Sequence, residues 1–245
     1  LRECRQIQID NSDIHSLEFG WKCNDIQLSN SKIHAEYLFF DSRDVTLENV
    51  RMSGKYSFQY MENLTIRNSY LDTKDAFWHS KNITVTGCTL KGEYLAWFSE
   101  GLTLIDCHII GTQPFCYCKD LKLINCTMEG TDLSFEYSDV DADIRGHVDS
   151  IKNPRSGCIT VDSVGEILMT NDTVMDCWMC GNRECPTYQR LNDEWLETVA
   201  ELDADDDCGG GGIPPTPARG WRVPACDISS TALSSSGRGC EGRGG

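Results

Sequence analysis

The chain has 245 residues, 40% of them hydrophobic, so it can form a substantial buried core. Its formal net charge of −16, without any cluster of Lys and Arg, argues against nucleic acid and anionic membranes as partners. No apolar run approaches the length of about 18 residues that a membrane-spanning helix needs. The opening residues LRECRQIQID contain neither an initiator Met nor an apolar signal segment. We therefore expect a fragment of a longer, cytoplasmic protein without a cofactor.

A repeat of 19 residues runs through the chain from its beginning. Residues 81–99, KNITVTGCTLKGEYLAWFS, can be laid without a gap over EGLTLIDCHIIGTQPFCYC, which follows directly. Steps of this length define two apolar columns. They are Ile7, Ile26, Val45, Leu64, Ile83, Leu102, Leu121, Val140 and Ile159, and Ile9, Leu28, Leu47, Ile66, Val85, Leu104, Leu123, Ala142 and Val161. Polar residues such as Gln8 and Thr46 lie between them, and this alternation predicts a half-buried β-strand in each repeat.

A third apolar column predicts a second short strand in each repeat. It contains Ile14, Ile33, Met52, Leu71, Leu90, Ile109 and Met128. Between the two strands lies a column of residues that tolerate a left-handed or turn backbone. It contains Asn11, Asn30, Asn49, Asn68, Gly87, Asp106 and Asn125. If each repeat is one coil, the amides of this column stack and form hydrogen bonds along it.

These columns predict an all-β fold, a right-handed parallel β-helix over residues 1–168. The repeat is too short for a leucine-rich repeat, and the glycine-anchored hexapeptide pattern of left-handed helices is missing. Coils would stack about 4.8 Å apart. The period becomes irregular in SDVDADIRGHVDSIKNPRSG, so residues 138–168 are expected to form the terminal coils.

The chain contains 14 cysteines, but Cys88, Cys107 and Cys126 occupy equivalent positions in successive repeats. Residues in one column of a β-helix behave as small buried hydrophobic groups. We therefore favour free thiols, which suit a reducing compartment, over a disulfide framework.

The third segment of each repeat is rich in aromatic residues, as in KYSFQYM, KDAFWHS and EYLAWFS. Strand alternation would place one set of its residues inside: Phe19, Leu38, Ala76, Leu95 and Leu133, with Trp21, Phe40, Trp78, Trp97 and Phe135. The other set would face solvent. It contains Tyr37, Phe39, Asp41, Tyr56, Phe58, Tyr60, Asp75, Phe77, His79, Tyr94, Phe98, Phe115, Tyr117, Asp132 and Glu136.

An exposed column of Tyr and Phe bordered by acidic groups is typical of a binding surface. Sugar rings stack on aromatic faces while carboxylates accept hydrogen bonds from their hydroxyls, so we expect an extended carbohydrate as the ligand. Packing beneath the C-terminal extension and contact with another subunit are the alternatives. The expected ligand-binding residues are Tyr37, Phe39, Tyr56, Phe58, Tyr60, Asp75, His79, Tyr94, Phe98, Tyr117, Asp132 and Glu136.

Catalysis by this surface is not indicated by the sequence. Glycoside hydrolysis needs two carboxyl groups about 5 to 9.5 Å apart. Asp132 and Glu136 would be about 13 Å apart on a straight strand, and Asp75 about 14 Å from Asp132 along the axis. We therefore assign no catalytic residue and expect a non-catalytic or weakly catalytic scaffold. A polysaccharide lyase or glycoside hydrolase is an alternative function.

The repeat is absent after Thr170. Residues 169–208 form an extension in which PTYQRLNDEWLETVAEL, residues 186–202, predicts one helix that could cap the last coil. Cys177, Cys180 and Cys185 resemble half of a zinc site whose fourth ligand would be Cys208 or a distant residue, but we predict no metal. Residues 209–245 are rich in Gly, Pro and Ser, which is typical of a disordered tail.

The repeat motifs resemble a bacterial family of β-helix proteins known as domain-of-unknown-function family 3737, grouped with the pectin-lyase-like superfamily. The matching text includes KDAFWHSKNITV, KGEYLAWFSEGLTLIDC, FCYCKDLKLINC, TDLSFEYSDVDADIRGHVDSIKNPRSG and VGEIL, over about residues 3–168. The resemblance implies further coils upstream and an uncapped N-terminal edge. It implies no established activity, and kinship with pectate lyases and polygalacturonases is an analogy of fold alone.

Overall fold

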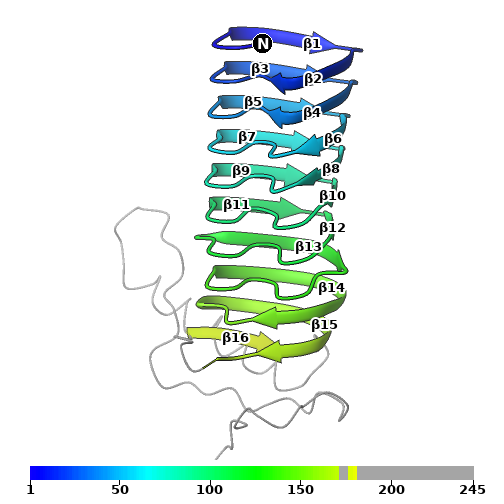
Figure 1. Ribbon diagram of the computed structural model, residues 1–245. Coiled ribbons are helices and arrows are strands. Elements are labelled where there is room, and N and C mark those ends of the chain that lie inside the picture. Colours follow the sequence, from blue (N-terminus) through cyan, green and yellow to red (C-terminus); the bar gives the residue numbers. More distant parts are fainter. Residues whose placement is uncertain (171–175, 181–245) are drawn as a thin grey trace, which may run out of the picture.

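The computed structural model describes residues 1–170 and the backbone of residues 176–180. The described chain is a parallel β-helix in which each coil contributes two short strands (Figure 1). The first strands of the coils are β1 (Arg5–Asp10), β3 (Asn24–Ser29), β5 (Arg43–Glu48), β7 (Glu62–Arg67), β9 (Lys81–Thr86) and β11 (Glu100–Ile105). The second strands are β2 (Asp13–Phe19), β4 (Lys32–Leu38), β6 (Arg51–Lys55), β8 (Tyr70–Lys74), β10 (Thr89–Lys91) and β12 (His108–Ile110).

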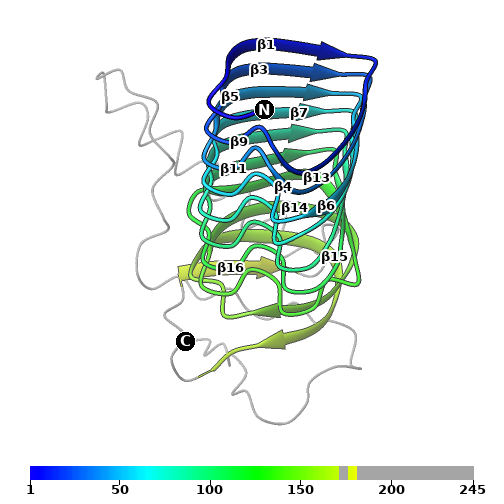
Figure 2. The same ribbon diagram turned by 45° about the horizontal axis from the view of Figure 1, so that its top comes forward.

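The strands stack in parallel along the axis of the rod, which Figure 2 shows with its N-terminal end tilted towards the viewer. Odd-numbered strands form one face and even-numbered strands form another. The two series join at β13 (Leu121–Glu129), which pairs with both β11 and β12. The stack continues through β14 (Asp139–Lys152), β15 (Ser156–Leu168) and β16 (Asp176–Cys180).

The pairing register confirms the predicted repeat. Leu102 lies opposite Ile83 on the neighbouring coil, and Leu104 lies opposite Val85. Both residues of each pair are buried, whereas Thr84 between them is exposed. Because side chains of a strand alternate between its two faces, every coil places its aliphatic residues on those of the coil before it. The core is therefore a continuous column along the rod.

The register near the end of the stack differs from the predicted one. Steps of 19 residues would place Ile159 beside Val140, but the structure pairs Val140 with Gly157 and Ala142 with Ile159. The coil is shorter here, and a further register shift occurs between β13 and β14. The assignment of Ile159 and Val161 to the two original columns is therefore wrong, although both residues are buried.

Left-handed residues turn the chain between the two strands of each coil, as predicted. Asn49, Asn68 and Gly87 have φ values of 54°, 50° and 63°. Hydrogen bonds along this column are present but not continuous: the amide of Asn49 donates to Asn30 at 3.1 Å, and Asn125 donates to Asp106 at 2.6 Å. A second amide column, which the sequence analysis missed, lies at the second residue of the first strands, where Asn82 in β9 donates to Asn63 in β7 at 3.2 Å.

The cysteines whose side chains the structure describes are all free thiols, and most are buried. Cys88, Cys107 and Cys126 lie in one interior column, as the repeat predicted. Burial raises the pKa of the Cys88 thiol to about 11. The same cause raises the pKa of Cys118 to about 11, so these groups are protonated at neutral pH.

Parallel pairing continues past Leu168, because β16 lies in register beside β15. The predicted helix at residues 186–202, the tail from residue 209, and Cys185 and Cys208 lie outside the described residues. Cys177 and Cys180 belong to β16, whose side chains are also outside the description. In the part of the chain that is described, no helix is long and apolar enough to cross a membrane.

Candidate binding surface

The third segment of each coil follows the second strand and returns the chain to the next first strand. Here every second residue has a left-handed backbone: Asp75, Phe77 and His79 have φ values of 54°, 62° and 55°. Such a segment bends rather than extends, so the alternation rule for strands does not sort its side chains. Burial therefore does not follow the two predicted sets of residues, one facing the interior and one facing solvent.

Phe39 and Phe58, which were expected to bind ligand, are fully buried, and so are Phe77 and Phe115. Their placement on the outer surface is wrong. Phe58 stacks on Phe39 with ring centroids 6.4 Å apart and on Phe77 at 5.1 Å. Because the rings of successive coils pack face to face inside the rod, they contribute to the core and cannot contact a ligand.

Asp75 is also misplaced by the sequence analysis. Its side chain was expected to face solvent, but the residue is only 6% exposed. Burial raises the pKa of this carboxyl group, while the nearby charge of Lys74 opposes the shift. A carboxylate in this position cannot accept hydrogen bonds from a ligand on the surface.

Four expected residues do lie together on the surface. Tyr60, His79, Phe98 and Tyr117 occur on successive coils, and Tyr137 follows them on the next coil. We call these five residues the aromatic strip. Consecutive ring centroids are 5.1, 4.9, 4.7 and 5.7 Å apart, and each pair is stacked. Tyr60, Phe98 and Tyr117 are 50%, 43% and 37% exposed, so the strip is an uninterrupted aromatic surface.

A column of indole rings borders the strip. Trp78 and Trp97 are stacked with centroids 5.4 Å apart, and their Nε1 atoms donate to the backbone oxygens of Tyr94 and Gln113 at 2.7 and 2.8 Å. The sequence analysis placed these two residues inside, together with Trp21 and Phe40, but all four are half-buried. Their rings fix the orientation of the neighbouring strip, because Trp97 packs edge-on against Phe98 and Tyr117.

Tyr37, Tyr56 and Tyr94 form a third, half-buried column beyond the indoles. Tyr37 and Tyr56 are stacked at 5.1 Å. The next ring, that of Tyr94, lies beneath the ammonium group of Lys74 at 5.0 Å and packs edge-on against Trp97. These expected binding residues therefore flank the aromatic strip instead of belonging to it.

The carboxylates at the C-terminal end of the surface, Asp132 and Glu136, are half-buried. Glu136 forms an ion pair with Lys152, with 2.7 Å between Oε1 and Nζ. Its carboxylate is therefore not a free hydrogen-bond acceptor. The coil that contains Asp132 and Glu136 is one residue longer than the repeat. Tyr137 therefore takes the position in the strip that a step of 19 residues would give to Glu136. The matching shift of the serine column, where Ser138 follows Cys118 by 20 positions, is a signal that could have revealed Tyr137.

Beside the strip, charged residues alternate in sign along the rod. Glu62 pairs with Arg43 at 3.7 Å, and Glu100 pairs with Lys81 at 3.4 Å. Neighbouring opposite charges cancel, so this border adds little net charge near the strip. The strip is therefore a nearly neutral surface on a chain whose net charge is −16.

The stacked geometry decides what the strip can contact. Ring faces cover one another along the axis, so the strip exposes ring edges to solvent. Aromatic edges carry the positive part of the ring quadrupole and attract electron-rich atoms such as oxygen. Among the described residues, no group of His, Cys, Asp and Glu is arranged to hold a metal ion.

Comparison with known proteins gives one family. A family model described as "Protein of unknown function (DUF3737)" matches residues 1–180. None of the curated proteins compared with the chain matches it. The matched range covers all the strands described above.

Proposed function

The chain belongs to the DUF3737 family of proteins of unknown function, and we propose that it is a non-catalytic scaffold that binds an extended, carbohydrate-like ligand along the aromatic strip. The observation that carries this proposal is the unbroken stack of five rings on successive coils, of which all but the half-buried Tyr137 are exposed. A contiguous apolar surface of this kind usually marks a site of interaction.

The chemistry of the strip favours a ligand rich in oxygen. Ring edges attract oxygen atoms, and the hydroxyls of Tyr60, Tyr117 and Tyr137 can both donate and accept hydrogen bonds. A polysaccharide presents hydroxyls and apolar CH groups along its whole length. Its chain would lie parallel to the rod axis and contact several coils at once.

The surroundings of the strip favour binding over catalysis. Asp75 is buried, and Glu136 is held by Lys152. Neither is therefore placed to act as general acid or base on a ligand that lies over the strip.

The test is a glycan array probed with the wild-type chain and with a Phe98→Ala/Tyr117→Ala variant. Ile124→Ala is the matched control, because Ile124 is a large apolar residue that is 47% exposed and lies outside the strip. We expect the wild type and the control to bind the same glycan and the double variant to lose at least tenfold in affinity, about 1.4 kcal/mol. Absence of binding in all three chains, or equal binding by the double variant, would contradict the proposal.

One observation favours a second function, that of an assembly module. Because the ring faces cover each other, the strip offers edges rather than the faces on which sugars stack best, and edge contacts are common in protein interfaces. A concentration-dependent mass in sedimentation that the same double variant abolishes would favour this function. Release of reducing or unsaturated sugars from a bound glycan would instead support a lyase or hydrolase.

We also propose that the protein is bacterial and cytoplasmic and that its family belongs with the pectin-lyase-like β-helices. The assignment to the pectin-lyase-like β-helices is supported by the parallel stacking of coils, each of which contains two apolar strands. Buried free thiols support a reducing compartment.

A further inference from the structure

Two basic residues lie side by side on the face formed by the even-numbered strands. Lys32 in β4 is directly opposite Arg51 in β6, on the next coil. Both residues are exposed, whereas Ile33 and Met52, which follow them in their strands, are buried. The two basic side chains therefore project from the same face, on strands about 4.8 Å apart. They are 19 positions apart in the sequence, so the stacking of coils makes them neighbours.

No carboxylate of the described chain lies within ion-pair distance of either charge. Elsewhere on this face, Lys55 and Lys74 are also directly opposite each other. Each of these two lysines forms an ion pair with a glutamate of a neighbouring coil, at 3.9 and 2.9 Å. Lys32 and Arg51 are thus the exception: two adjacent positive charges that the protein itself does not neutralise.

The column that contains Lys32 and Arg51 consists of hydrogen-bond donors. From Lys32 onward, the residues opposite one another on successive coils are Arg51, Tyr70, Thr89, His108, Thr127 and Arg145. Asp13 precedes Lys32, but its carboxylate lies 3.1 Å from Nε2 of His15. On a chain whose net charge is −16, this column is therefore a local surface that favours an anion.

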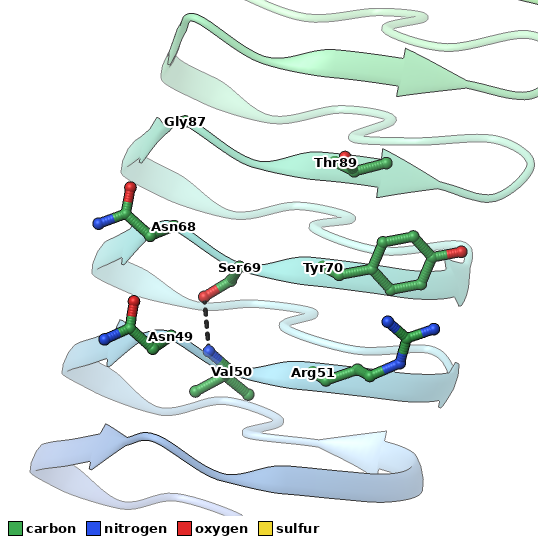
Figure 3. A pocket seen from close by; sticks show the side chains of 8 residues that line it. All are labelled: Asn49, Val50, Arg51, Asn68, Ser69, Tyr70, Gly87 and Thr89. Carbon is green, nitrogen blue, oxygen red and sulfur yellow. Dashed lines mark hydrogen bonds between the residues drawn. The ribbon is translucent and has the colours of Figure 1, made fainter.

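Arg51 is held against an aromatic ring without the use of its hydrogen-bond donors. Its guanidinium group lies 4.5 Å from the centroid of the Tyr70 ring, as Figure 3 shows. Both residues line a shallow hollow of about 460 Å³ that is open to solvent. In the described chain, the guanidinium N–H groups form no hydrogen bond. Stacking on a ring leaves these donors free in the guanidinium plane, where an anion can accept from two of them.

We infer that Lys32 and Arg51 bind a tetrahedral oxoanion, either free phosphate or sulfate or the same group on a larger molecule. The guanidinium fork of Arg51 takes two of its oxygens, and the ammonium group of Lys32 takes a third. A carboxylate has only two oxygens and serves both side chains less well. The bound anion also removes the repulsion between the two adjacent cations. Because the site is exposed, the dissociation constant should be roughly millimolar and should rise with salt.

The test is an NMR titration of the full chain with inorganic phosphate, sulfate, glucose 6-phosphate and acetate at constant ionic strength. The backbone N–H signals of β4 and β6 report binding. We expect saturable shifts with phosphate and sulfate, and binding of acetate that is at least about fivefold weaker. Tighter binding of glucose 6-phosphate than of phosphate would identify a phosphate ester as the occupant, and equal or weaker binding the free ion; either result supports the site. No saturable shift with phosphate or sulfate, or equal binding of acetate, would overturn the inference.

Matched removal of charge decides whether the two side chains act together. Lys32→Gln and Arg51→Gln should each weaken phosphate binding at least about fivefold, because each removes one charged donor. The control is Arg43→Gln, which removes the same charge from the odd-numbered strands, where Arg43 pairs with Glu62 at 3.7 Å. This variant should bind phosphate as the wild type does. Equal losses in all three variants would show a non-specific attraction to positive charge and would contradict the site.

Tyr70 is a positioning residue in this inference, and its substitution gives a readout that net charge does not move. Tyr70→Phe keeps the ring against the guanidinium group and should bind phosphate normally. Tyr70→Leu removes the ring, so binding should weaken about threefold, with circular dichroism to check that the chain is folded. Wild-type binding by a folded Tyr70→Leu chain would contradict the positioning of Arg51 by the ring. The Phe98→Ala/Tyr117→Ala variant should bind phosphate normally, so this inference and the proposed function can fail separately.

Discussion

At the scale of single residues, the position within the third segment, and not backbone handedness, decides whether an aromatic ring supports the core or faces solvent. Phe77 and Phe98 both have left-handed φ values, 62° and 61°. Phe77 is fully buried between coils, whereas Phe98 is 43% exposed on the aromatic strip. The two positions differ only in their place within the third segment of the coil. The same residue type in the same backbone conformation therefore has two different roles.

This difference predicts unequal effects of the same substitution. Phe77→Ala removes a stacked interior ring and leaves a cavity, so it should lower the free energy of unfolding by about 3 to 5 kcal/mol. Phe98→Ala should lower it by less than about 1 kcal/mol, because much of that ring is in water. Urea denaturation followed by circular dichroism measures both values. Similar losses for the two variants would show that the strip is as important to the fold as the interior column.

At the scale of the element, side-chain hydroxyls and thiols satisfy backbone groups where each third segment meets the next first strand. Ser138 accepts a hydrogen bond from the backbone N–H of Cys118 at 2.8 Å and donates one to the carbonyl of Phe115 at 2.6 Å. On the preceding coil, the thiol of Cys118 donates to Ala96 at 3.0 Å. Serine and cysteine thus both occur in this column because both can donate from a small, buried side chain.

Ser138→Ala should therefore lower the free energy of unfolding by about 1 to 3 kcal/mol, since it leaves two buried backbone groups without their partner. Ser138→Cys should cost less, because a thiol can still donate to the carbonyl. The control is Ser53→Ala, which removes an exposed hydroxyl bonded to His34 and should have a small effect. Chemical denaturation at one pH compares the three variants. Equal stability of Ser138→Ala and wild type would disprove this role of the column.

At the scale of the whole molecule, each coil contacts only the coils before and after it. Residues 81–99 form one complete repeat, and their removal would join Ser80 to Glu100, the residue that lies opposite Lys81 on the next coil. When one coil is deleted, the two coils on either side of it can therefore pair directly, and every remaining residue stays in the same column. This property follows from the parallel register and not from any single contact.

Deletion of residues 81–99 should give a chain that keeps its β-sheet circular dichroism and a cooperative unfolding transition, at somewhat lower stability. Deletion of residues 82–99 removes one residue fewer, so Lys81 becomes an extra residue at the start of a first strand and shifts the side chains of that strand by one position, which exchanges its buried and exposed faces. That chain should lose cooperative unfolding. If both deletions behave alike, the register of the columns does not hold the fold together.

The sequence by itself determined the stacking of coils. The pairing of Ile83 with Leu102 and the left-handed turns at Asn49 and Asn68 could be predicted, because strand alternation and residue preference for φ are local properties repeated at a fixed step. The same information located four residues of the aromatic strip, although it also assigned Phe39, Phe58 and Asp75 to the surface.

Only the tertiary structure decided which way the third segment points its side chains. In a bent segment the direction of each side chain depends on its own φ and ψ and on the ring below it, and neither can be derived from a period of two. The loss of two residues between Ala142 and Ile159 is likewise visible only when neighbouring coils are in contact.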